Sequence, residues 1–208
     1  TDESGKGDYF GPLVIAGVYI EDDKMEIALR NLGVKDSKLM SDKKIEELAK
    51  KIKQLCKYTI VRIGPEKYNQ LYYKMKNLNK LLGWGHARAI EDMLEIVKPD
   101  VVISDKFGDE FFIKSKLMEK GKKVNLIQEI KAEQNIAVAA ASILARDTFL
   151  QSLVKLSKQY GINLPKGAGE GVLKAGRIVI RDRGNELLKK IAKDHFSITN
   201  KIIHKNFV

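Results

Sequence analysis

The sequence has one cysteine, no long apolar run and no leader-like opening, and each absence excludes a class of protein. Because Cys56 is the single cysteine, an intrachain disulfide framework and a CxxC metal or redox pair are excluded. No uninterrupted apolar run approaches the roughly 18 to 20 residues that span a bilayer. The chain opens on Thr1 and polar residues rather than on a basic segment followed by an apolar one. We therefore expect a cytoplasmic protein that does not associate with membranes.

Acidic residues are also scarce relative to basic ones. The chain has 27 Asp and Glu against 38 Lys and Arg, a formal net charge of +11. Such a surplus indicates a polyanionic partner, either nucleic acid or an anionic membrane surface. A generally lysine-rich composition that serves heat tolerance is the alternative. The asymmetry of sign favours nucleic acid.

Length and hydrophobic patterning predict an α/β protein. The 208 residues, 44% of them hydrophobic, suit one large domain. Apolar, β-branched runs predict strands at 12–20, 58–63, 101–105 and 124–128. Helical periodicity predicts helices at 24–32, 41–54 (with Ser41 as N-cap), 66–97, 109–120, 135–159 and in the tail from 171. Strands interleaved with helices predict a sheet flanked by helices, in a single domain 1–208 with a helical extension at about 170–208.

Several familiar site motifs are absent. The glycines of 5–11 do not have GxGxxG spacing and precede a strand instead of opening a helix. Neither a GxxxxGK[ST] loop nor a GxSxG elbow occurs. His86, His195 and His204 lie in helical patterns without HExxH spacing or a cysteine partner, so packed or surface histidines are favoured over a zinc site.

Four carboxylates occupy special positions in the predicted elements. Asp2 and Glu3 are adjacent and are followed by a Ser-Gly-Lys-Gly loop, whose amides and lysine suit a phosphate. Asp105 ends an apolar strand, and Glu133 precedes an alanine-rich helix. In open α/β sheets, residues at the carboxyl ends of strands line the ligand crevice. These acids are therefore the candidate functional residues.

Each acid taken alone also has a structural interpretation. On that interpretation, Asp2 and Glu3 would be a surface pair and Asp105 would start a loop. Glu133 would interact with the dipole of the helix that follows it. Together, in a chain with surplus positive charge, they favour a cation held between them. Carboxylate oxygens suit Mg²⁺ or Mn²⁺, and two such ions about 3.5 to 4 Å apart clamp the attacking and leaving oxygens of a phosphodiester. The pattern therefore favours a metal-dependent nuclease.

The opening residues carry a family resemblance. Thr1–Val14 resembles the active-site motif of the type 2 ribonucleases H, in the form typical of the ribonuclease HIII branch. The resemblance continues along the whole chain, in residues 33–38, 68–72, 77–90, 131–133, 139–143 and 164–168. It implies a ribonuclease H-like fold, a mixed five-stranded sheet with helices on both faces.

The resemblance also implies an activity: endonucleolytic hydrolysis of the RNA strand of RNA/DNA hybrids, leaving 5′-phosphate and 3′-hydroxyl ends, in DNA replication and repair. The family's four acids map onto Asp2, Glu3, Asp105 and Glu133, which would ligate two Mg²⁺ (or Mn²⁺) ions with substrate bound. Residues Ser4, Gly5, Lys6 and Gly7 would bind substrate near the ribose 2′-hydroxyls, which distinguish RNA from DNA. We expect a monomer that needs no obligate protein partner.

Two departures from the family pattern qualify the prediction. Ala168 follows Lys166-Gly167 where ribonuclease HII has a tyrosine that recognises a DNA-to-ribonucleotide junction, so we expect little excision of single embedded ribonucleotides. The N-terminal substrate-binding domain of ribonuclease HIII, which resembles that of the TATA-binding protein, has no counterpart in this sequence, so we expect a catalytic domain alone. The alternatives are ribonuclease HII-like junction cleavage, a non-catalytic hybrid-binding module and a nuclease that cuts DNA.

Overall fold

A computed structural model describes residues 1–204, which form two compact units that interleave along the sequence. Unit 1 comprises residues 1–4, 14–61 and 77–148. Unit 2 comprises residues 5–13, 62–76 and the described residues from 149 onward. The strands are β1 (Asp2–Ser4), β2 (Leu13–Tyr19), β3 (Lys57–Ile63), β4 (Val102–Asp105) and β5 (Leu126–Glu129). The helices are α1 (Asp23–Asn31), α2 (Asp42–Leu55), α3 (Pro65–Met75), α4 (Leu78–Leu94), α5 (Phe111–Lys114), α6 (Ile136–Tyr160), α7 (Glu170–Arg183), α8 (Asn185–Ile191) and α9 (Ile198–Ile203), with 3-10 turns η1 (Ser37–Leu39), η2 (Gly121–Lys123) and η3 (Ala132–Gln134).

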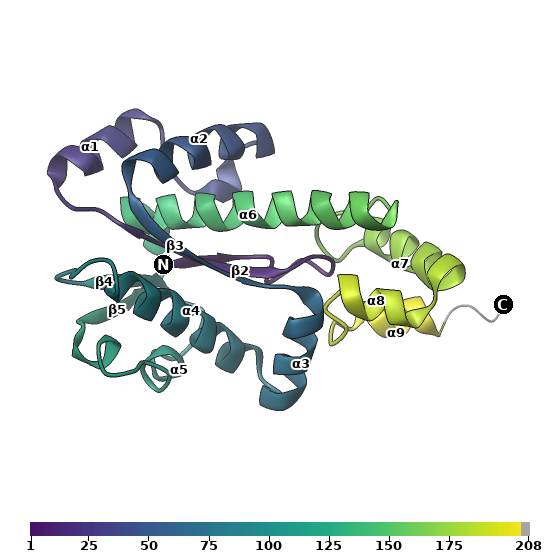
Figure 1. Cartoon of the computed structure of the whole chain (residues 1–208). Helices are drawn as coiled ribbons and strands as arrows, with labels where there is room; N and C mark the ends of the chain where they lie inside the picture. Colours follow the sequence, from purple (N-terminus) through teal and green to yellow (C-terminus); the bar gives the residue numbers. More distant parts are fainter. Residues whose placement is uncertain (205–208) are drawn as a thin grey trace. The chain divides into compact units, whose positions relative to one another are not determined.

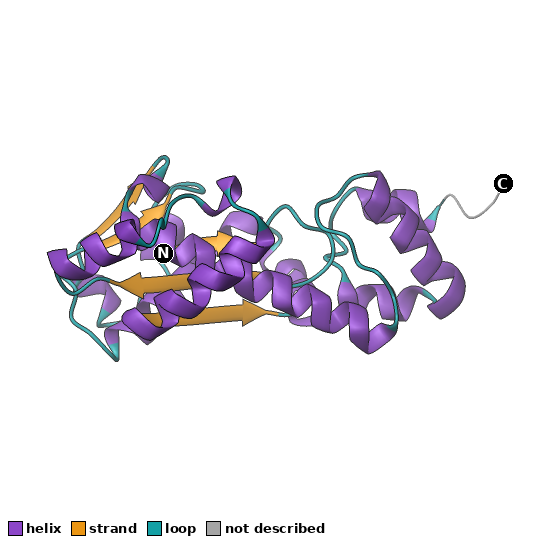
Figure 2. Cartoon of the chain, turned by 90° about the horizontal axis from the view of Figure 1, so that it is seen from above, coloured by secondary structure: helices purple, strands orange, loops and turns teal. Residues whose placement is uncertain are grey.

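Unit 1 is a sheet covered by helices on both faces. Helices α1, α2 and the first part of α6 cover one face, and α4 and α5 cover the other (Figure 1). Figure 2 shows the molecule from above, from the side of α1, α2 and α6, with strands visible beneath the helices. This is the α/β layering expected when strands alternate with amphipathic helices.

The strands of unit 1 are arranged as three plus two. One sheet has the order β1-β2-β3, with β1 antiparallel to β2 and Asp2 opposite Ala16. The other pairs β4 with β5 in parallel, with Asp105 opposite Glu129. Two hydrogen bonds join Thr1, the residue before β1, to β4: the Thr1 amino group donates to the Ile103 carbonyl, and the Asp105 amide donates to the Thr1 carbonyl. The two sheets therefore meet at Thr1, between the start of β1 and β4.

The longest predicted helix, 66–97, is two helices in the structure. Lys76 adopts a left-handed conformation, with φ of 51°, and ends α3. Asn77 then caps α4 by accepting the backbone N–H of Lys80. Asparagine tolerates the extended cap geometry and supplies the side-chain acceptor, so it restarts the helix. By contrast, Ser41 caps α2 as predicted, accepting from the Lys44 amide.

The predicted helix 109–120 was wrong over most of its length. Only α5, Phe111–Lys114, is α-helical there. The buried Glu91 carboxylate of α4 accepts the backbone N–H groups of Met118 and Gly121, at 2.6 and 3.1 Å. These tertiary hydrogen bonds replace helical ones and draw the chain into a turn against α4, which local periodicity does not record.

Helix α6 is a core helix of the fold. It is long and apolar enough to cross a membrane, but 67% of its most apolar stretch is buried inside the fold. Residues Ala139–Ala141 are at most 1% exposed. Six residues further on, the Asp147 side chain is 3% exposed and forms an ion pair with Lys53 of α2 at 2.9 Å. Small side chains let neighbouring elements approach α6 closely, and the buried ion pair fixes α2 upon it.

Unit 2 is built mainly from helices. Helix α7 packs against α8 and α9, and α3 packs against α8. The close approach of α7 and α9 requires Gly176, because a Cβ there would lie 2.4 Å from the Ile202 side chain. The prediction of one domain with a helical extension from about 170 stays a prediction, although α7 to α9 do provide the expected helices.

Candidate functional site: a carboxylate cluster in unit 1

The four predicted acids come from three neighbouring segments of unit 1. Asp2 and Glu3 lie on β1, and Asp105 is the last residue of β4, which is hydrogen-bonded to the residue before β1. The Asp105 carboxylate accepts the backbone N–H of Ala132 at 3.3 Å. This hydrogen bond fixes η3, the turn that carries Glu133. The sheet and one side-chain hydrogen bond thus bring together residues that lie up to 131 positions apart.

Electrostatics confirm that these carboxylates share one neighbourhood. Burial, and next the charge of Glu3, raise the pKa of Asp2 to about 8. Burial also raises the pKa of Asp105, where Glu3 and Glu133 act in the same direction. Carboxylates crowded in this way disfavour their own ionised forms unless a cation compensates them.

The carboxylates are near one another without forming a closed shell. Within residues 1–204, no group of three or more His, Cys, Asp or Glu side chains is drawn together as a ready-made metal site. The donors are nevertheless of the right chemistry, because carboxylate oxygens are the ligands that Mg²⁺ and Mn²⁺ prefer. The cluster fits a divalent cation whose binding would relieve the mutual repulsion.

Lys38 faces this cluster and was missed as a site residue. It lies in η1, which Asp36 caps by accepting the Lys38 amide. Partial burial lowers the pKa of Lys38, but Asp36, Asp2, Glu133 and Asp105 outweigh that effect and the net pKa is raised. The only sequence signal for it is its place in the 33–38 segment.

His86, which is packed in the core as one of the two expected placements, also reaches the cluster. It lies on α4, is fully buried, and its Nε2 is 3.1 Å from Glu3 Oε2. Nothing in the sequence pairs His86 with Glu3, 83 residues away. His195 packs in unit 2 with its Nε2 2.8 Å from the Tyr68 hydroxyl, as a packed histidine would.

The predicted substrate loop begins at the end of β1. Ser4 closes the strand, and Gly5, Lys6 and Gly7 form the turn that follows, in unit 2. Gly5 has a φ of +87°, and a Cβ there would lie 2.2 Å from the Pro12 carbonyl oxygen, so the turn requires glycine. No atom lies within 4 Å of a Cβ placed at Gly7. The backbone at Gly7 is therefore open to approach.

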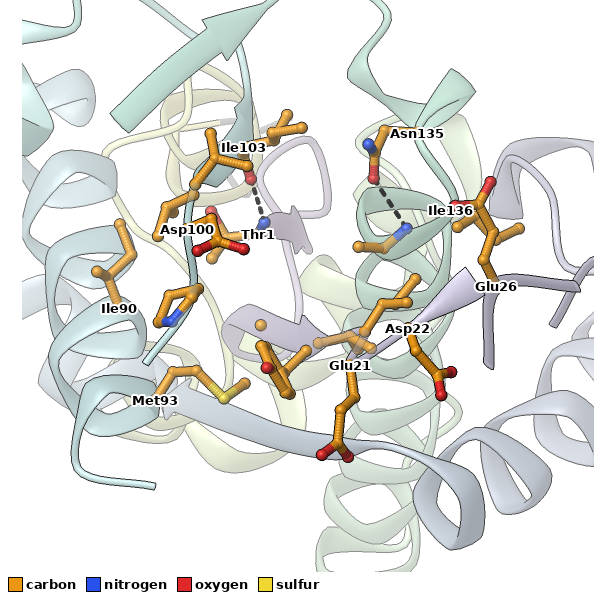
Figure 3. Close-up of a pocket in the computed structure, with 18 of the residues that line it drawn as sticks. Thr1, Glu21, Asp22, Glu26, Ile90, Met93, Asp100, Ile103, Asn135 and Ile136 are labelled. Atoms are coloured by element: carbon orange, nitrogen blue, oxygen red, sulfur yellow. Dashed lines mark hydrogen bonds between the residues drawn. The ribbon is translucent and has the colours of Figure 1, made fainter. Parts of the chain in front are cut away.

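A separate cavity of about 330 Å³ lies in unit 1 near Thr1 (Figure 3). Acidic side chains line part of it, including Glu21, Asp22 and Glu26. None of the four predicted acids is among its lining residues. The carboxylate cluster is thus distinct from this cavity, and the position of the cavity does not indicate the candidate site.

Comparison with known proteins identifies relatives over nearly the whole chain. The family model described as Ribonuclease HII matches residues 1–199. Ribonuclease HIII of Protochlamydia amoebophila is 51% identical over 204 residues, covering 98% of this chain and 67% of the relative. Ribonuclease HIII of Chlamydia pneumoniae is 48% identical over 204 residues, covering 97% and 68%. The chain thus spans about two thirds of the length of these relatives.

Solved structures agree with the sequence relatives. Bst-RNase HIII in complex with Mn²⁺ has a TM-score of 0.89 and 34% identity, with 97% of this chain and 67% of that chain covered. Aquifex aeolicus RNase H3 has a TM-score of 0.76 and 34% identity, with coverage of 93% and 70%. The expected ribonuclease H-like fold is confirmed. On the family match and these relatives, the chain belongs to the type 2 ribonuclease H family, in its ribonuclease HIII branch.

Proposed function

We propose that this chain hydrolyses the RNA strand of RNA/DNA hybrids as a divalent-metal-dependent endonuclease. The observation that carries the proposal is the cluster of four carboxylates, in which burial and like charges raise the pKa of Asp2 and of Asp105. A basic chain of net charge +11 has no need of such a cluster to bind a polyanion. A cation held there would bring the acids and the phosphodiester into one site.

Asp2, Glu3, Asp105 and Glu133 would hold the metal, as two Mg²⁺ (or Mn²⁺) ions once substrate is bound. The chemistry supplied by such ions is activation of water and stabilisation of the leaving 3′ oxygen. The products would carry 5′-phosphate and 3′-hydroxyl ends. Asp105 has a second task, since its hydrogen bond to Ala132 orients the turn that carries Glu133.

Two further groups would bind the hybrid. Lys38, whose charge is favoured by the surrounding acids, would hold a phosphate oxygen beside the cluster. The loop of Ser4, Gly5, Lys6 and Gly7 directly follows Glu3, so its backbone donors would meet the ribose 2′-hydroxyls next to the scissile phosphate. The open backbone at Gly7 suits that approach.

The proposed setting follows from the substrate. RNA/DNA hybrids arise in DNA replication and repair, so we place the enzyme in the cytoplasm, acting there as a monomer without an obligate protein partner. Ala168, where ribonuclease HII has tyrosine, predicts weak cleavage at single embedded ribonucleotides.

The test compares four labelled substrates in parallel: an RNA/DNA hybrid, duplex RNA, duplex DNA, and duplex DNA with one embedded ribonucleotide. Each is assayed with Mg²⁺, with Mn²⁺ and with chelator. The proposal predicts metal-dependent cleavage of the hybrid and little cleavage of the others. Preferred cleavage at the single ribonucleotide would establish ribonuclease HII-like specificity instead. Hybrid binding without cleavage in either metal would establish a non-catalytic module, and cleavage of all-DNA duplex would contradict recognition of the 2′-hydroxyl.

A further inference from the structure

The His86 side chain contacts β1, β4 and Thr1, the residue before β1. Its Nε2 is 3.1 Å from Glu3 Oε2 on β1. Its Nδ1 is 2.9 Å from the Thr1 hydroxyl and 3.3 Å from the Ser104 hydroxyl of β4. The imidazole is fully buried and stacks on Phe107 at a centroid distance of 5.0 Å. The ring therefore lies between its own helix, α4, and the residues at the start of β1. Figure 1 shows α4 close to the N-terminus.

The surrounding groups fix which ring nitrogen donates. The Ser104 hydroxyl lies 3.2 Å from the Asp105 carbonyl, to which it donates. An ionised Glu3 carboxylate can only accept, so Nε2, at 3.1 Å from it, carries the proton and donates. In a neutral imidazole Nδ1 is then the acceptor, with the Thr1 hydroxyl 2.9 Å away.

We propose that His86 is a positioning residue that aims the Glu3 carboxylate for metal binding. This inference rests on the proposed function. A donor on one oxygen of a metal-binding carboxylate restricts the rotation of that group and lowers the cost of ordering it when the metal binds. Glu3 is the middle residue of the three-residue strand β1, and His86 contacts its carboxylate from the 17-residue helix α4.

A second buried polar residue on α4 shows what a purely structural role looks like. Glu91 is 5% exposed, and its carboxylate accepts two backbone N–H groups of the segment that follows α5. Its hydrogen bonds close this loop and go to Met118 and Gly121, not to the four acids. Glu91 is thus a matched control: replacing it disturbs the same helix without touching the cluster.

The test measures Mn²⁺ affinity of the whole chain by titration calorimetry, with circular dichroism to verify folding. His86→Leu removes the donor and is expected to weaken Mn²⁺ binding by about 10- to 100-fold. His86→Gln keeps an N–H donor near the Nε2 position and should restore affinity to within a few-fold of the original. His86→Asn, whose amide is too short to reach Glu3, should behave like His86→Leu. Glu91→Leu should lower thermal stability and leave Mn²⁺ affinity unchanged.

A double-mutant cycle with Glu3→Gln identifies the route of the effect. If His86 acts through Glu3, His86→Leu should add no further loss of Mn²⁺ affinity in the Glu3→Gln background. An equal loss in both backgrounds, or an equal loss in Glu91→Leu, would overturn the inference, as would unchanged affinity in His86→Leu. Should His86→Leu not fold, the contrast between His86→Gln and His86→Asn decides the question. Absence of Mn²⁺ binding to the original chain would instead count against the proposed metal site.

Discussion

Each of the two units buries charge, and the two do so in opposite ways. Unit 1 crowds carboxylates together, so that burial and like charges raise the pKa of Asp2 to about 8. Unit 2 buries the ammonium group of Lys193, which is 0% exposed. Its Nζ donates to the carbonyls of Asp8 and Gly11, at 2.7 and 2.8 Å, and lies 5.6 Å from the centroid of the Tyr68 ring.

The surroundings of Lys193 satisfy it as a donor. Carbonyl oxygens and an aromatic face contact the amine, although burial still disfavours its charged form. Nearby, Asp8 accepts the Gly167 amide at 2.7 Å, and the Tyr9 amide donates to the Gly167 carbonyl at 2.8 Å. Lys193 thus completes a network of hydrogen bonds that holds the 5–11 turn within unit 2.

The contrast separates a structural charge from one that we propose to be functional. Lys193 is provided with acceptors by its own fold, whereas burial and like charges raise the pKa of Asp2 and Asp105, which in our proposal bind a cation. Mutation of Lys193 should therefore lower the stability of the fold. Mutation of a carboxylate in unit 1 should instead lower activity, with little loss of stability. Proteins in general give up some stability at strained or destabilised active sites in exchange for activity.

The largest effect is expected at Asp105. Asp105→Asn keeps the acceptor for Ala132 but removes a charge, so hybrid cleavage in Mg²⁺ should fall by about 10²- to 10³-fold. Thermal stability should stay the same or rise, because like-charge repulsion decreases. Asp100→Asn, an exposed Asp→Asn control just before β4, should leave cleavage unchanged. Near-normal cleavage by Asp105→Asn would remove it from the site.

Lys193 should show the reverse behaviour. Lys193→Met leaves the Asp8 and Gly11 carbonyls without their donor, and we expect a loss of about 2 to 4 kcal/mol in the free energy of unfolding. The exposed Lys190→Met, three residues earlier, should change stability by no more than about 0.5 kcal/mol. Urea unfolding monitored by circular dichroism measures both. Equal stability of the two variants would show that the buried ammonium contributes nothing to the fold.

Gly5 and Gly7, in the turn after β1, allow a role in backbone conformation to be distinguished from a role in substrate binding. Gly5→Ala places a methyl group against the Pro12 carbonyl at positive φ, and should cost about 1 to 3 kcal/mol of stability. Gly7→Ala meets no atom within 4 Å and should leave stability nearly unchanged. If the Gly7 backbone approaches the ribose, Gly7→Ala should still raise the KM for hybrid. An unchanged KM together with an unchanged melting temperature would exclude Gly7 from substrate binding.

The smallest effect is a pH dependence from Lys193. Burial lowers the pKa of its ammonium to about 7, against 10.5 for an ordinary lysine. Between these two values the unfolded chain keeps a proton that the folded chain has lost, so the Lys193 contribution to stability rises with pH. Just above pH 7 the slope should be roughly 1 kcal/mol per pH unit. The difference between the original chain and Lys193→Met isolates this slope; a difference that is flat from pH 6 to 9 would contradict the depressed pKa.

The sequence located the acids because their positions follow from local rules. A carboxylate at the end of an apolar strand, as with Asp105, and one before an alanine-rich helix, as with Glu133, mark an edge of the sheet whatever the details of packing. The family resemblance then indicated which acids belong together. Strands β2 to β5 and the long helices α2 and α6 were predicted for the same reason, since hydrophobic period is a local property, whereas the three-residue strand β1 was not predicted.

The residues that act across the fold were not predictable in this way. His86 contacts Glu3, and the charge of Glu133 acts on Lys38, only once the chain has folded. Neither the type of these residues nor their spacing in the sequence indicates such interactions. The same holds for the failed helix at 109–120, which was undone by hydrogen bonds from Glu91, a residue on another element.

The most direct test of the central claim is the position of Mn²⁺ in crystals of this chain, found by its anomalous scattering. The account predicts anomalous density among the carboxylates of Asp2, Glu3, Asp105 and Glu133, and its loss in Asp105→Asn. Density instead at the acidic cavity of Figure 3, beside Glu21, Asp22 and Glu26, would contradict the assignment of the metal site to the four-carboxylate cluster.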